Sequence, residues 1–92
     1  MKFRKKPIIV EAYHFNGTLE SYTFLNKWSN GKVCGYNTNF DNVLLDIVID
    51  TLEGQMFAYP GYWIIKGVAG EFYGCESNIF YQTYEEVYSL DI

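Results

Sequence analysis

The pattern of apolar and polar positions divides the chain into short segments of strand and helix character. Residues 8–15 form a β-branched and aromatic run that ends at the turn signal Asn16-Gly17, so we expect a strand there. Period two places its even-numbered residues on one face and its odd-numbered residues on the other. The side chains alone do not indicate which of the two faces is buried.

Apolar residues then recur at helical spacing between Thr18, whose side chain suits a helix N-cap, and the stop signal Asn30-Gly31. These residues are Leu19, Tyr22, Leu25 and Trp28. The spacing predicts an amphipathic helix of about three turns that packs its aromatic face on a sheet.

The middle of the chain indicates three more strands. Residues 32–40 are polar and interrupted by glycine, which favours an irregular edge strand. Residues 43–50 are β-rich, and the turn chemistry at 51–54 joins them to residues 55–59 in a hairpin.

A second hairpin and a helix follow the dipeptide Pro60-Gly61, which has the chemistry of a type II turn. The hairpin joins residues 62–66 to 71–75, and it reverses at Val68-Ala69-Gly70. Residues 78–88 carry apolar side chains at mixed helical spacing, which predicts a short C-terminal helix.

Consecutive hairpins flanked by two helices predict an α+β fold. We expect a small curved antiparallel sheet, or a partly open barrel, of about five to six strands with two short helices. With 92 residues, the chain is expected to be a single domain, 1–92, with one modest core. No apolar run approaches membrane-spanning length, and residues 7–12 are too short for a signal-peptide core, so we expect a cytosolic protein without a membrane partner.

Charge is distributed unevenly along the chain. The formal net charge is −4, yet Lys2, Arg4, Lys5 and Lys6 cluster at the N-terminus and the remainder is strongly acidic. Duplex nucleic acid is therefore not an expected partner, because binding a long polyanion needs many distributed cations. A compact phosphate ligand needs far fewer.

The sequence contains no catalytic constellation, so we do not expect an enzyme. His14 is the single histidine, and the sequence has no nucleophile elbow. Lys66 lies beside Gly67 but in a strand, so these residues do not form a phosphate loop. Cys34 and Cys75 lack metal-ligand spacing, so they are interpreted as buried reduced thiols, and neither a metal nor a cofactor is expected. Glu11 and Glu71 could approach one another for acid–base work, although salt bridges are the alternative role for both.

Aromatic residues make up 20% of the chain and occur in nearly every segment. Most of them must supply the core of so small a domain. Period two nevertheless makes it difficult to bury both members of Tyr62-Trp63 or of Phe72-Tyr73, so we expect some rings at the surface. Exposed rings can stack on nucleobases or, alternatively, form a dimer interface.

Two segments carry a family resemblance. The opening at 2–7 with Glu11-Ala12, and Pro60-Gly61 followed by the run 63–75, resemble a widespread group of small phage and prophage proteins. The resemblance covers both ends of the chain and the middle poorly. The chain departs from the group at Tyr62, where relatives usually have aspartate, and at Gly74, where they usually have proline, so no role of that aspartate is carried over.

The chain also resembles, in size and make-up, phage sponges that sequester the cyclic nucleotide signals of bacterial immunity. This resemblance implies a homodimeric anti-CBASS protein in the host cytoplasm that binds a cyclic dinucleotide, such as cyclic GMP-AMP, without cleaving it. Rings would stack on the bases, cations would meet the phosphates and Glu71 would read a base edge. The implied ligand-binding residues are Arg4, Lys5, Glu11, Tyr13, Trp63, Lys66, Glu71 and Tyr73.

Two alternatives remain beside this hypothesis. One is a phage inhibitor that docks directly on a host nuclease or another defence protein and uses its acidic face as a nucleic-acid mimic. The other is an accessory protein of the virion.

Overall fold

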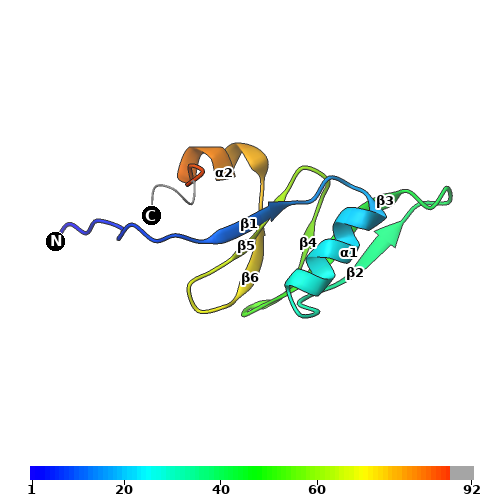
Figure 1. The fold of residues 1–92 in the computed structure, drawn as a ribbon, viewed down its shortest axis with the longest axis horizontal. Coiled ribbons are helices and arrows are strands. Elements are labelled where there is room, and N and C mark those ends of the chain that lie inside the picture. Colours follow the sequence, from blue (N-terminus) through cyan, green and yellow to red (C-terminus); the bar gives the residue numbers. More distant parts are fainter. Residues whose placement is uncertain (88–92) are drawn as a thin grey trace.

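Six strands form two three-stranded antiparallel sheets, with one helix associated with each sheet (Figure 1). The structure is a computed structural model, and it describes residues 1–87. The elements in this range are β1 (Glu11–His14), α1 (Leu19–Trp28), β2 (Val33–Thr38), β3 (Leu44–Thr51), β4 (Gly54–Ala58), β5 (Trp63–Lys66), β6 (Phe72–Cys75) and α2 (Ser77–Thr83).

The first sheet has the strand order β1-β5-β6. β5 lies in its centre, with Ile64 opposite both Tyr13 of β1 and Gly74 of β6. Ile64 and Ile65 point to opposite faces of the sheet, yet both are buried. The sheet is therefore covered on both sides, by α1 and the second sheet on one face and by α2 on the other.

The second sheet has the order β2-β3-β4. Gly54, with φ of +109°, turns the chain from β3 into β4, which is the hairpin that the sequence predicts. β2 is an edge strand, and its pairing with β3 shifts register twice, between Val33 and Gly35 and between Asn37 and Thr38. The expectation of an irregular edge strand is thus confirmed.

The main core fills the space between the two sheets and α1. Its fully buried members include Phe15, Leu25, Val33, Ile47, Ile49 and Ile64. The sheets pack tightly at Gly74, where an added Cβ atom would lie 3.3 Å from Cβ of Ala58 and 3.4 Å from Cδ1 of Ile49. A side chain at position 74 would therefore separate the sheets.

The ends of α1 follow the sequence signals. The Ser21 amide donates to Oγ1 of Thr18 over 3.0 Å, which caps the first turn, and Asn30 and Gly31 end the helix with positive φ. Ser29 is buried, and its Oγ accepts from the Val33 amide over 2.9 Å, which fixes the start of β2. Within residues 1–87, neither helix is long and apolar enough to cross a membrane.

The α+β class, the strands and the two helices are confirmed, while three details differ from expectation. α2 ends at Thr83, because the backbone of Tyr84 is extended, and residue 88 of the predicted helix lies outside the described residues. β1 begins at Glu11 instead of residue 8, because residues 8–10 have no strand partner in the described part of the chain. The strands form two sheets that do not close into a barrel. The cause is the turn at Pro60-Gly61. The Gly61 amide donates to the Phe15 carbonyl and the Phe15 amide donates to the Tyr62 carbonyl, which places β5 beside β1 instead of β4.

Replacement of Gly74 by valine is expected to destabilise the fold by about 1–3 kcal/mol, because the new methyl groups overfill the contact between the sheets. Gly35→Val is the matched control, since this glycine also lies in a strand and has no atom within 4 Å of an added Cβ. Chemical denaturation of both variants measures the difference. Equal stability of the two variants would contradict this account of the sheet contact.

Candidate functional site

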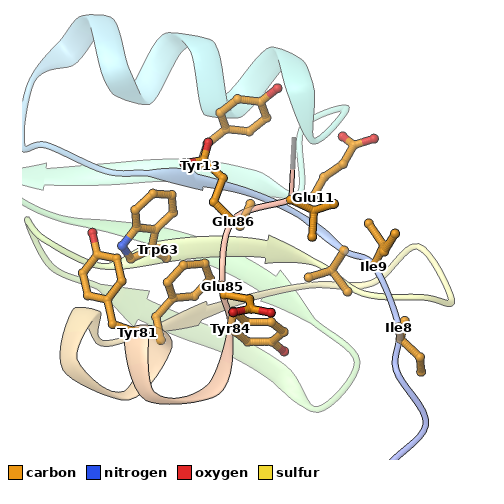
Figure 2. A pocket seen from close by; sticks show the side chains of 13 residues that line it. Ile8, Ile9, Glu11, Tyr13, Trp63, Tyr81, Tyr84, Glu85 and Glu86 are labelled. Carbon is orange, nitrogen blue, oxygen red and sulfur yellow. The ribbon is translucent and has the colours of Figure 1, made fainter. Parts of the chain in front are cut away.

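A cleft of about 500 Å³ lies between the segment leading into β1 and the segment that contains and follows α2 (Figure 2). Ile8, Ile9 and β1 border it on one side, and Tyr81, Tyr84 and Glu85 border it on the other. Trp63 of β5 lies between these two sides.

The strand and helix periods explain why aromatic rings collect in the cleft. The alternation of side chains along β5 turns Trp63 toward α2. Phe80 and Tyr84 are four residues apart, so both lie on the side of α2 that faces Trp63, with Tyr84 directly after the end of the helix. The Trp63 and Phe80 rings stack with centroids 4.5 Å apart and planes inclined by 6°. The Tyr81 ring meets the Trp63 indole edge-on at 5.9 Å, and Tyr84 lies 5.1 Å from Phe80.

Two hydrogen bonds tie α2 to the rest of the fold. Ser77 Oγ donates to the carbonyl oxygen of Gly61, which fixes the start of α2 beside the turn before β5. The hydroxyl groups of Tyr73 and Tyr84 lie 3.4 Å apart, which links β6 to the segment after α2. Burial, and then the Tyr84 hydroxyl, raise the pKa of Tyr73, so this phenol remains protonated at physiological pH.

The indole N–H of Trp63 is buried and has no hydrogen-bond partner among the described residues. An unsatisfied buried donor costs free energy that a ligand acceptor would recover. Figure 2 shows this indole beside the Tyr81 ring. Tyr81 is 65% exposed, so a ligand can reach the stack from that side.

Charged groups at the cleft are mostly acidic. Glu11, Glu85 and Glu86 line it, and the Glu11 carboxylate accepts a hydrogen bond from Nε1 of Trp28 over 3.1 Å. The ammonium group of Lys5 lies 5.9 Å from the centroid of the Tyr84 ring. The cleft therefore has an acidic border with one cation near its Tyr84 end.

Some of the residues predicted to bind ligand come together in this cleft. Trp63 lies in the stack and Lys5 reaches the border. Glu11 and Tyr13 line the cleft, but they occupy the opposite face of β1 from Ala12, and the Tyr13 ring turns toward α1 (Figure 2). There it meets the rings of Phe24 and Trp28 at 4.7 Å and 4.9 Å.

The structure places the other predicted residues elsewhere. The Glu71 carboxylate folds back over the β5–β6 turn, where it accepts from the Ala69 amide over 3.4 Å. Glu71 and Tyr73 line a second cavity, of about 300 Å³, beside the β3–β4 turn, and only the hydroxyl of Tyr73 reaches Tyr84 at the first cleft. Lys66 is exposed at the end of β5, opposite Glu11 in register, and Arg4 is exposed in the segment before β1. Glu11 and Glu71 thus take different partners.

Sequence reasoning did not include Phe80, Tyr81 and Tyr84 among the ligand-binding residues. Their signal is the pairing of a tryptophan in a strand with aromatic residues at i and i+4 in the following helix. That pattern predicts a stack only when the helix is known to fold back over the strand. The contact is tertiary, so the local pattern alone could not assign it.

The two cysteines are free thiols. Cys34 is exposed, which corrects the expectation of burial, because β2 is an edge strand whose alternate residues face outward. Cys75 is half-buried, and burial followed by the Glu76 carboxylate raises the pKa of its thiol. Across residues 1–87, no three His, Cys, Asp or Glu side chains gather in a way that could hold a metal ion.

Replacement of Phe80 by alanine is expected to loosen α2, because it removes the stack on Trp63, an aromatic pair worth about 0.5–1.5 kcal/mol beyond buried area. Amide hydrogen exchange should show faster exchange across residues 77–84 while β3 and β4 stay protected. Ile79→Ala is the control, since Ile79 is exposed on the same helix. If both variants exchange alike, the stack does not hold the helix.

Comparison of the chain with family models, with curated proteins and with solved structures finds no match in any of the three.

Proposed function

We propose that this protein binds a cyclic dinucleotide in the aromatic cleft and holds it without cleavage, as a phage sponge against the cyclic nucleotide signal of CBASS immunity. The observation that carries the proposal is the stack of Trp63 on Phe80, bordered by Tyr81 and Tyr84, within a cleft of about 500 Å³. The resemblance in size and make-up to phage sponges points to the same class of function.

The aromatic groups suit a nucleobase ligand. A base that stacks on an aromatic side chain gains about 1–3 kcal/mol, whatever its identity. The volume of the cleft falls within the range of small-molecule sites. The Trp63 N–H is unpaired among residues 1–87 but buried, so an acceptor on a base edge, such as O6 or N7 of guanine, reaches it only when the exposed Tyr81 ring moves aside.

The charged groups determine how such a ligand must lie. Each phosphate of a cyclic dinucleotide is an anion, so it is repelled by Glu85 and Glu86 and attracted by Lys5. The phosphates are therefore expected toward the basic N-terminal segment, and the bases toward Trp63 and Tyr81. Binding alone removes the signal from its effector, so no catalytic group is needed.

Calorimetric titration with a panel of cyclic di- and trinucleotides tests the proposal. One cyclic dinucleotide should bind tightly and be recovered intact, by chromatography, after denaturation. Tyr81→Ala should weaken this binding about 5–150-fold, which corresponds to one lost base stack. Tyr59→Ala is the control, because this exposed tyrosine does not line the cleft. No binding across the panel would overturn the proposal.

The acidic border also supports a second candidate, an inhibitor that docks on a basic surface of a host defence protein. Glu11, Glu85 and Glu86 line one cleft, and carboxylates next to exposed rings suit arginine and lysine side chains of a protein partner. This candidate and the sponge predict opposite effects of removing the carboxylates.

The double variant Glu85→Gln/Glu86→Gln is expected to bind the cyclic dinucleotide more tightly, about 2–5-fold, because two exposed like charges are removed. A remote change of equal charge, Glu20→Gln/Asp41→Asn, should leave affinity almost unchanged. Titrations at two salt concentrations measure both effects. Weaker nucleotide binding, or loss of a captured basic protein partner, would favour the second candidate.

A further inference from the structure

Residues 1–10 form an extended arm before β1, and its N-terminal part projects from the molecule (Figure 1). Nearer to β1, Lys5 lies over Tyr84, and Ile8 and Ile9 border the cleft. The arm contains the β-branched run Ile8-Ile9-Val10, in which Ile9 is 65% exposed, directly before β1. Such a run is suited to pair as a strand. Within residues 1–87, however, no strand pairs with it.

The outer edge of β1 is also unpaired within the described residues, because β1 is the first strand of the order β1-β5-β6. The Phe15 amide donates to Tyr62 O over 2.8 Å, and the Phe15 carbonyl accepts from the Gly61 amide. Since backbone groups alternate along an antiparallel strand, Ala12 and His14 direct their N–H and C=O groups away from β5. This exposed edge can accept another strand.

Charge separates the arm from the body. Four of the seven Lys and Arg residues lie in residues 1–6, which contain no acidic residue. The rest of the chain has three cations against eleven carboxylates, and the cleft itself is bordered by Glu11, Glu85 and Glu86. The arm is therefore complementary to the body of a second copy.

We propose that two copies pair antiparallel through their β1 edges, so that each arm lies along the β1 strand of the other copy and brings Arg4 and Lys6 to that copy's cleft. This inference rests on the proposed function, because it supplies the cations that a dianionic ligand requires. It makes the site a shared one, with rings from one copy and cations from both.

Two features favour one register of this pairing. Pro7 has no N–H, so it must occupy a position that makes no hydrogen bond to the second copy. This condition is met when even-numbered residues lie opposite even-numbered residues, because the even-numbered residues then make these hydrogen bonds. A two-fold axis at Glu11 would oppose two carboxylates, whereas an axis at Val10 does not. The axis at Val10 places Lys6 of one copy opposite His14 of the other.

This register completes the cleft at its second end. His14 packs its ring against Trp63 with centroids 5.3 Å apart, so a lysine opposite His14 lies on the Trp63 face of the sheet. The chain's own Lys5 lies at the other end, over Tyr84. A ligand with two phosphates and two bases would then find a cation at each end and stacking rings between them.

Disulfide trapping tests the pairing without any ligand, in a Cys34→Ser/Cys75→Ser background. Directly opposite, hydrogen-bonded residues have Cα atoms about 5.5 Å apart, a distance that suits a disulfide. Val10→Cys should form a covalent dimer on mild oxidation, while Val43→Cys should not. A mixture of Lys6→Cys and His14→Cys chains should form a disulfide between chains, whereas each variant alone should form none. Monomeric light scattering, or no cross-link in the mixture, would overturn the dimer.

Mixing two defective variants tests the shared site. Tyr81→Ala removes a ring, and Arg4→Gln/Lys6→Gln removes the donated cations, so each variant alone should bind the cyclic dinucleotide more weakly, by about 5–150-fold for Tyr81→Ala. After exchange of subunits, half of the dimers are mixed and have one intact site of two, so the mixture should recover about one quarter of wild-type capacity.

The outcomes separate this inference from the proposed function. Cross-linking together with recovery supports the shared site. If the wild-type protein binds the cyclic dinucleotide but the mixture of variants recovers no binding, the cations act within one chain and the shared site is overturned. If the wild-type protein binds no cyclic nucleotide, the proposed function fails and so does the shared nucleotide site, while the trapping result still decides the β1 pairing.

Discussion

Burial of β5 on both faces is the constraint on which the rest of the structure depends. Ile64 and Ile65 are neighbours in sequence and point in opposite directions, yet both are excluded from solvent. Burying both requires a layer on each side of the first sheet, so α1 and the second sheet must cover one face and α2 must cover the other. The same requirement places Trp63 under α2, and the stack of Trp63 on Phe80 is its direct consequence.

The turn before β5 transmits this constraint to both ends of the chain. Pro60 and Gly61 reverse the backbone, with Gly61 at φ of +100°, and the Gly61 amide then bonds to Phe15. This bond joins β5 to β1 and directs the chain away from β4. The Gly61 carbonyl accepts from Ser77, so the turn that sets the sheet order also sets the start of α2. The cleft depends on all three contacts.

Local patterns in the sequence predicted most of the secondary structure, because caps, turns and periodicity act over a few residues. Thr18, Asn30-Gly31 and Pro60-Gly61 all play the predicted local roles. The division into two sheets was not predicted, since it depends on which strand β5 pairs with. The site was predicted only in part for the same reason: period two separates Tyr13 from Trp63 across the sheet, and only the fold brings Tyr84 near Lys5.

The basic residues of the arm and the acidic residues of the cleft are separated along the chain, and this separation affects which anions the protein can attract. Carboxylates at the border of the cleft repel phosphates, and the densest cluster of cations in the sequence lies in residues 1–6, before β1. Placing the cations on the arm lets the body remain acidic, which disfavours long nucleic acids, while a small dianion can still be held once the arm is positioned. Selectivity for a compact phosphate ligand over a polymer would then follow from where the charges lie, with no need for a deep pocket.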